Sequence, residues 1–162
     1  MSELYDLFLK HPRISTDTRK IEPDSIFFAL RGANFDGNRF VAEALEKGAA
    51  YAVSDDAGTA AADERIRYAE DTLQALQELA REHRRALGIP ILAISGSSGK
   101  TTTKELVSRV LAERFAVYAT RGNLNNHIGV PLTLLSMTRD TEFGVVEMGA
   151  SARGELALLS SI

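Results

Sequence analysis

A glycine-rich stretch, Gly96-Ser97-Ser98-Gly99-Lys100-Thr101-Thr102, has the residue types and spacing of a phosphate-binding loop. Glycines let the backbone approach a phosphate closely, and successive N–H groups in such a loop form an anion site. Lys100 can neutralise the β- and γ-phosphates, and the Thr101 hydroxyl can bind Mg²⁺. The spacing, G-x-x-G-K-T, is two residues shorter than the common loop. We expect these seven residues to bind the phosphates of a nucleotide; the alternative is a plain glycine turn with an exposed lysine.

The elements around this loop predict a parallel sheet. The apolar run 91–94 is typical of a strand covered on both faces, and a helix is expected from about Lys100 to Arg114. Further strands are expected at 117–120 and 143–147, and the order strand, loop, helix, strand predicts a right-handed parallel crossover. The third strand would leave an unpaired edge. The helical spacing predicts that four apolar side chains point inward: Leu106, Val107, Val110 and Leu111.

Two groups of polar residues follow these strands. Glu147 ends the third strand, where a carboxylate beside a phosphate loop can hold Mg²⁺ directly or through water; the alternative is an ordinary acid facing solvent. The segment 121–131 contains three asparagines and two glycines after the second strand. Asparagine amides suit peptide or sugar-phosphate groups, although composition alone favours a turn followed by a helix starting at Pro131.

The sequence changes character near residue 88, so we predict two domains, 1–87 and 88–162. The first alternates short strands, at 14–17, 25–30 and 50–53, with helices. Its last helix is capped by Asp71 and ends before Gly88, with His83 expected to be packed rather than functional. The segment 32–38 is expected to be a loop. The predicted fold class is α/β, a small mixed α/β domain followed by an incomplete parallel sheet of the P-loop type.

Composition excludes several classes of protein. The chain has 162 residues and no cysteine, which excludes disulfides and thiolate metal sites. Its formal net charge of −3 gives no basic field for binding nucleic acid. It is 44% hydrophobic and 25% charged, as expected of a globular protein. The apolar runs are too short to span a bilayer.

Several motifs together resemble the Mur ligases, the ATP-dependent amide ligases of peptidoglycan synthesis. The segment 95–105 looks like the ATP loop of that family. The segments 122–135 and 146–149 are similar to the branch that joins D-alanyl-D-alanine to UDP-N-acetylmuramoyl-tripeptide. The segments 15–19 and 35–40 resemble the family's N-terminal, UDP-binding domain. The resemblance spans nearly the whole chain, with its motifs in family order.

The resemblance implies a reaction in which the substrate carboxylate attacks the γ-phosphate of ATP and the amine of D-Ala-D-Ala then displaces phosphate. It implies catalytic roles for Lys100, Asn125 and Asn126, metal ligands at Thr101 and Glu147, and the cofactors ATP and Mg²⁺. The residues that it implies for the UDP-sugar are Ser15, Thr16, Asp17, Thr18, Arg19, Arg31, Gly32, Phe35, Asp36, Gly37 and Asn38. It also implies a cytoplasmic bacterial enzyme that is monomeric at full length, does not insert into membranes and does not bind nucleic acid.

Two alternatives stay open: the related ligase that adds the third amino acid to the same precursor, and a non-catalytic module that binds a UDP-sugar or nucleotide. Two departures from the family are also visible. Ser151 and Ala152 stand where many relatives have Asn-His, so we expect no second-metal ligand there. Family members have three domains, so we expect this chain to lack the rest of the central domain and the C-terminal domain, and to be inactive alone.

Overall fold

The computed structural model describes residues 2–162, which divide into two compact units, one up to Leu76 and one from Gln77 to Ile162. The division falls inside helix α4 (Thr72–Leu87). The boundary expected from the sequence, between residues 87 and 88, coincides instead with the end of this helix. Asp71 caps the helix as expected, because its carboxylate accepts a hydrogen bond from the Gln74 N–H at 2.9 Å.

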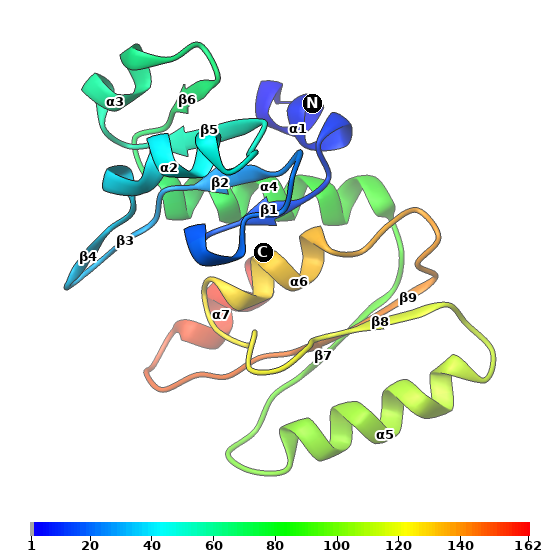
Figure 1. The fold of residues 1–162 in the computed structure, drawn as a ribbon. Helices are drawn as coiled ribbons and strands as arrows, with labels where there is room; N and C mark the ends of the chain where they lie inside the picture. Colours follow the sequence, from blue (N-terminus) through cyan, green and yellow to red (C-terminus); the bar gives the residue numbers. More distant parts are fainter. Residues whose placement is uncertain (1) are drawn as a thin grey trace. The chain divides into compact units, whose positions relative to one another are not determined.

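The first unit is built on a four-stranded parallel sheet in the order β1-β2-β5-β6 (Figure 1). The strands are β1 (Ile14–Ser15), β2 (Ile26–Phe28), β5 (Tyr51–Ser54) and β6 (Ile66–Tyr68). The helical elements are α1 (Glu3–Lys10), η1 (Thr18–Lys20), η2 (Gly37–Phe40), α2 (Val41–Glu46), α3 (Ala57–Ala62) and the start of α4. Crossover helices between parallel strands are expected of such a sheet.

The core of the first unit lies on both faces of β2. Phe27 packs in a cluster with Val41, Ala44 and Leu45 of α2, the residues whose helical spacing the sequence shows. Ile26 and Phe28, which point to the other face of the strand, are also fully buried. The sheet is therefore covered on both sides and forms a rigid base for the loops at its edge.

One segment of this unit differs from the prediction. Residues 32–38, expected to be a loop, contain most of a short antiparallel hairpin, β3 (Arg31–Gly32) and β4 (Phe35–Asp36), and lead into η2. A Cβ atom on Gly37 would lie 2.6 Å from the carbonyl oxygen of Leu30, so only glycine fits where the hairpin closes. Strands of only two residues show too little alternation of polar and apolar residues to be predicted from the sequence.

The second unit contains a three-stranded parallel sheet in the order β7-β9-β8, with α5 on one face and α6 and α7 on the other (Figure 1). Its strands are β7 (Ile91–Ile94), β8 (Val117–Ala119) and β9 (Phe143–Glu147). Its helices are the rest of α4, α5 (Lys100–Ala112), α6 (Gly129–Leu135) and α7 (Glu155–Ser161). The register pairs Ile94 of β7 with Glu147 of β9, so the ends of both strands meet at one edge.

Two expectations for this unit are wrong. The third strand in sequence is not an edge: β9 lies between β7 and β8, because both pair with it. The apolar side chains of α5 are not all inward, since Leu106 is 60% and Val110 is 72% exposed, and Leu92 of β7 is exposed as well. Among the described residues of α5, the fully buried one is Lys104. Val107 and Leu111, on the same face of the helix, are half-buried, so the helix meets the sheet through this face and leaves Leu106 and Val110 to solvent.

The buried His83 should make stability depend on pH. Its Nε2 lies 2.9 Å from the carbonyl oxygen of Met137. Burial lowers the pKa of the imidazole below its ordinary value of 6.5, and the hydrogen bond to that carbonyl opposes this shift. The unfolded chain therefore binds more protons near neutral pH than the folded chain. The stabilising contribution is complete above pH 6.5 and is lost as the pH falls through the lower folded-state pKa.

We expect His83→Gln to flatten this dependence. The free energy of unfolding, measured by urea titration between about pH 7 and about pH 5, should fall less in the variant than in the parent chain. His127→Gln, at an exposed position, is the control and should keep the parental slope. Equal slopes in the parent and His83→Gln chains would contradict the assignment.

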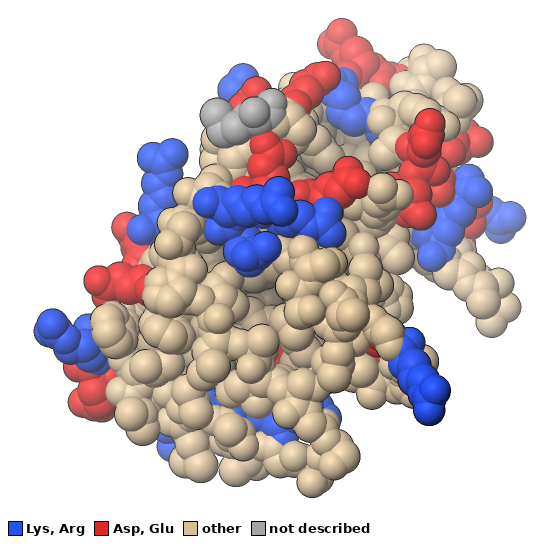
Figure 2. All heavy atoms as spheres, turned by 180° about the vertical axis from the view of Figure 1, so that it is seen from behind, with Lys and Arg blue, Asp and Glu red and all other residues tan. Residues whose placement is uncertain are grey.

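Charged side chains of both signs are mixed on the face of the molecule that Figure 2 shows, where Lys and Arg lie beside Asp and Glu and broad areas are uncharged. Ion pairs between near neighbours in sequence, such as Arg19 with Asp17 and Arg65 with Asp63, produce such mixing. Within residues 2–162, no helix has the length and apolar character needed to cross a membrane.

Candidate active site

The predicted phosphate loop joins the end of β7 to the start of α5. Residues 95–99 are exposed, and Gly99 has a φ of 75°, a left-handed conformation that glycine adopts without strain. Lys100, the first residue of α5, folds back so that its Nζ donates to the carbonyl oxygen of Gly96 at 2.7 Å. The lysine ammonium and the helix N-terminus thus lie over the same loop, as an anion site requires.

Glu147 reaches this loop from the end of β9. The residue is only 3% exposed, so the alternative of an ordinary acid facing solvent is wrong. Its Oε2 accepts a hydrogen bond from the Thr101 hydroxyl at 3.0 Å, and its Oε1 accepts one from Asn125 Nδ2 at 2.9 Å. Three residues that the sequence places far apart are therefore brought together at one edge of the sheet.

Backbone contacts hold these side chains in place. Thr120, just beyond β8, accepts the Glu147 N–H on its hydroxyl at 2.9 Å. The carbonyl oxygen of Asn125 accepts the Gly149 N–H at 2.7 Å, and a Cβ atom on Gly149 would lie 3.1 Å from the Asn125 side chain. A larger residue at position 149 would crowd Asn125 away from Glu147.

The Thr101 and Glu147 oxygens fit a single magnesium ion. Adjacent ligands of an octahedral Mg²⁺ lie about 2.9 Å apart, close to the 3.0 Å between these two oxygens. Over residues 2–162, no three His, Cys, Asp or Glu side chains cluster as a complete protein cage would need. Magnesium commonly binds one or two protein ligands and takes the rest from substrate phosphates and water, so the donor set matches a metal that arrives with a nucleotide.

The second predicted catalytic asparagine has a different local environment. The Asn126 Oδ1 accepts hydrogen bonds from the N–H groups of Ile128 and Gly129, at 3.1 and 2.8 Å, and so caps the start of α6. A Cβ atom on Gly129 would lie 2.3 Å from the backbone of Leu124, which fixes the tight path of this loop. The structure brings Asn125, but not the Asn126 amide, into contact with Glu147.

In the first unit, two of the predicted UDP-binding segments line one pocket of about 540 Å³. Its walls are Thr16, Asp17, Thr18, Arg19, Phe27, Phe35 and Phe40. Phe35 is 50% exposed, and its ring stacks on that of Phe40 with centroids 5.5 Å apart. The pocket therefore combines hydroxyl groups with an accessible aromatic face.

An ion pair lies at the polar end of this pocket. Asp17 Oδ2 is 2.7 Å from Arg19 Nη2, and the hydrogen bonds from Arg19 lower the pKa of the Asp17 carboxyl to about 2. The same carboxylate caps η1 by accepting the Arg19 N–H at 2.9 Å. Ser15 is buried, and its hydroxyl donates to the carbonyl oxygen of Asp17.

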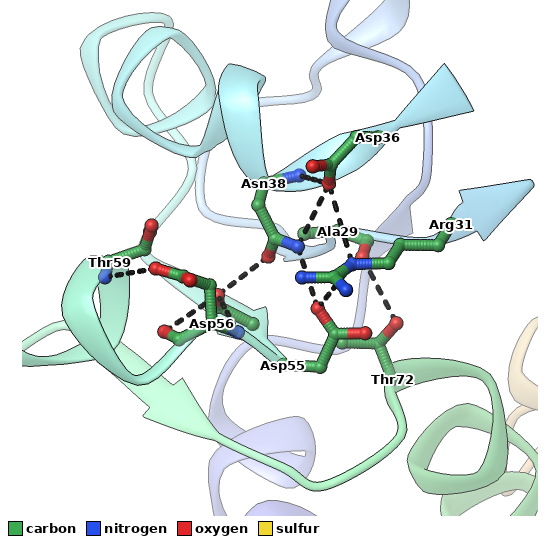
Figure 3. Close-up of polar contacts among 9 residues, drawn as sticks. Ala29, Arg31, Asp36, Asn38, Asp55, Asp56, Thr59 and Thr72 are labelled. Carbon is green, nitrogen blue, oxygen red and sulfur yellow. Dashed lines mark hydrogen bonds and ion pairs between the residues drawn. The ribbon is translucent and has the colours of Figure 1, made fainter. Parts of the chain in front are cut away.

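The remaining predicted UDP-binding residues belong to a separate polar cluster at the base of the hairpin. Figure 3 shows Arg31, Asp36, Asn38 and Asp55 pointing toward one another. Asp55 Oδ1 is 2.9 Å from Arg31 Nε and accepts Asn38 Nδ2 at 2.6 Å, while Asp36 accepts Asn38 Nδ2 at 2.9 Å. Gly32 is the last residue of β3, and Gly37 follows β4 as the first residue of η2. The contacts between the polar side chains fasten the hairpin, so this group holds Phe35 in place rather than lining the pocket.

Sequence reasoning assigns no individual role to four residues that support these two sites. Thr120 and Lys104 connect to Glu147 in the second unit, and Phe40 and Asp55 support the hairpin in the first. Asp55 and Thr120 each follow a strand directly. Ligands of parallel sheets bind beyond the carboxyl ends of the strands, so this position could have indicated both residues. Nothing in its local pattern marks Lys104 as buried.

Comparisons with known proteins identify the class to which this arrangement belongs. Residues 12–84 match the model of the Mur ligase family, catalytic domain, and residues 94–162 match the Mur ligase middle domain. The two matches follow one another over most of the chain. The chain belongs to the Mur ligase family.

The individual relatives narrow the family to one branch. UDP-N-acetylmuramoyl-tripeptide–D-alanyl-D-alanine ligase from Bacillus subtilis is 44% identical over 150 residues, which are 92% of this chain and 33% of that protein. The enzyme of the same name from Escherichia coli is 39% identical over 150 residues, 92% of this chain and 32% of that protein. The chain thus spans about a third of the length of the curated relatives it matches.

Solved structures of the same branch share the fold. A MurF ligase from Thermotoga maritima in complex with ADP matches with a TM-score of 0.83 and 32% identity, over 99% of this chain and 36% of that one. MurF from Acinetobacter baumannii matches with a TM-score of 0.84 and 37% identity, over 91% of this chain and 32% of that one. The predicted α/β fold of the Mur ligase type is confirmed.

Proposed function

We propose that the full-length protein carrying these residues is an ATP-dependent ligase that joins D-alanyl-D-alanine to UDP-N-acetylmuramoyl-tripeptide. The observation that carries the proposal is the convergence of the phosphate loop, Thr101, Asn125 and Glu147 at the ends of β7 and β9. The 44% identity with the Bacillus subtilis enzyme of that name supports the choice of substrates.

In the proposed reaction each residue of the second unit has a distinct task. The loop and Lys100 bind the phosphates of ATP, Thr101 and Glu147 would hold Mg²⁺, and Asn125 orients the Glu147 carboxylate. When bound, Mg²⁺ supplies positive charge that offsets the phosphate oxygens. The tripeptide carboxylate attacks the γ-phosphorus and ADP leaves; the amine of D-Ala-D-Ala then attacks the acyl carbon and phosphate leaves.

We further propose that the first unit binds the uridine diphosphate part of the substrate. Thr16 and Thr18 line the pocket with hydroxyl groups, and Phe35 offers an exposed ring on which a base can stack. Because two of the three substrates, ATP and the UDP-linked tripeptide, are nucleotides of the cell interior, we place the enzyme in the cytoplasm of a bacterium. We also propose that the full-length enzyme is a monomer.

Phe35→Ala should weaken binding of UDP to the chain by about tenfold, since base–aromatic stacking is worth about 1–3 kcal/mol. The measurement is an NMR titration with UDP. Tyr68→Ala, which removes another exposed aromatic ring of the same unit, is the matched control and should leave the affinity unchanged. Equal affinities in the Phe35→Ala and parent chains would place the uracil elsewhere.

The proposed activity is tested by phosphate release from ATP in the full-length protein. Release should require both UDP-N-acetylmuramoyl-tripeptide and D-Ala-D-Ala. The related ligase that adds the third amino acid is the enzyme alternative, and it would instead turn over with UDP-N-acetylmuramoyl-dipeptide and a single amino acid. A protein that binds both nucleotides but releases no phosphate with either substrate set would be the non-catalytic module.

A further inference from the structure

The residue through which α5 is buried is a lysine. Lys104 is 2% exposed, whereas Leu106 and Val110 on the same helix are largely exposed. Burying an ammonium group costs free energy that a leucine or methionine would not cost, unless the charge gains well-placed partners. The position of α5 therefore depends on what the Lys104 ammonium contacts.

Lys104 fastens α5 to the end of β8. Its Nζ donates to the carbonyl oxygen of Thr120 at 2.7 Å in a buried hydrogen bond. The same Nζ is 3.0 Å from Glu105 Oε1, on a side chain that is itself exposed. The buried contact of the Lys104 ammonium is thus with a backbone carbonyl, and its charge is balanced by the carboxylate of the exposed Glu105.

Thr120 passes this restraint on to Glu147. Its backbone N–H donates to Val145 in β9 at 2.9 Å, and its hydroxyl accepts the Glu147 N–H at 2.9 Å. The Glu147 carboxylate in turn accepts from the Thr101 hydroxyl. Thr101 and Lys104 lie three residues apart, on one face of α5, so the contacts form a closed ring through helix, strand end and carboxylate.

We propose that Lys104 is a positioning residue that sets the separation between the Thr101 hydroxyl and the Glu147 carboxylate; this rests on the proposed function, in which those two groups hold Mg²⁺. Lys104 has no access to the nucleotide, because its ammonium is buried against Thr120. Its effect is on the metal-binding pair. Removing it frees the first turns of α5 to shift relative to β9.

The experiment compares ADP affinity with excess Mg²⁺ and with EDTA, by calorimetry on the 162-residue chain. In the parent chain Mg²⁺ should tighten ADP binding. In Lys104→Met, which keeps the length of the side chain and removes its charge, that gain should shrink by about tenfold. Affinity in EDTA should change little, because the loop and Lys100 are retained.

Control variants separate positioning from general loss of stability. Ser108→Ala removes a hydroxyl that donates to the Lys104 carbonyl oxygen within the helix, and Glu105→Gln removes the exposed charge partner; both should keep the parental gain. Thr120→Val removes the acceptor of the Glu147 N–H and should behave like Lys104→Met. Thr120→Ser keeps the hydroxyl and should restore the gain.

A crystal structure of Lys104→Met without nucleotide tests the same point independently of ligand binding. We expect the Thr101–Glu147 hydrogen bond to be broken there. The inference is overturned if that bond persists, or if ADP affinity falls equally with and without Mg²⁺. If Lys104→Met does not fold, Lys104→Leu, which also removes the ammonium donor but has a smaller apolar side chain, is measured by the same criteria. If the full-length protein with Lys104 intact binds no ADP, the proposed function fails, and the crystal structures of the variants still decide the inference.

Discussion

Lys100→Ala should lower the kcat of ligation by about 10³-fold in the full-length protein, the scale on which removal of a preorganised charge stabiliser acts. The Lys100 ammonium is held over the loop by the Gly96 carbonyl oxygen, so it is already placed where phosphate charge would develop. Little of its effect should appear as loss of fold, because the side chain is not part of a core. The measurement is phosphate release at saturating substrates.

This substitution also separates an enzyme from a binding module. Lys10→Ala, at an exposed position near the end of α1, is the matched control for loss of one lysine and should keep the parental rate. A module would show weaker nucleotide binding in Lys100→Ala and no turnover in either chain. A kcat within about threefold of the parent would remove Lys100 from the catalytic machinery.

Glu147→Gln should raise the Mg²⁺ concentration that gives half-maximal rate about tenfold and lower kcat about 10²-fold. Glutamine keeps the shape of the side chain but loses the negative charge. It also keeps only one acceptor oxygen, so it cannot serve both Thr101 and Asn125, which donate to the two carboxylate oxygens. The measurement is a Mg²⁺ titration of the ligation rate in the full-length protein.

Glu142→Gln is the control at the opposite end of β9. That carboxylate also accepts a hydrogen bond, from the Ala116 N–H at 2.8 Å, but it is exposed and lies away from the phosphate loop. It should leave the Mg²⁺ dependence unchanged. Parental Mg²⁺ dependence in Glu147→Gln would mean that the buried carboxylate serves structure and not the metal.

The phosphate loop and the elements beside it can be predicted from the sequence. The strand 91–94, the helix start at Lys100 and the strand 143–147 agree with the structure, because local spacing sets hydrophobic periodicity and glycine positions. The position of Glu147 at a strand end followed from the same local pattern. The sequence motifs also indicate the Thr16–Arg19 segment and Phe35, which the structure brings together in one pocket.

Tertiary structure alone decided which of these residues meet. The sequence order of the strands does not reveal that β9 inserts between β7 and β8, and this insertion puts Glu147 beside Thr101. It does not reveal that Lys104, rather than Leu106 or Val110, is the residue of α5 turned inward. Strand pairing and helix rotation arise from contacts between segments distant in the chain, and a local period of two or 3.6 residues carries no information about those partners.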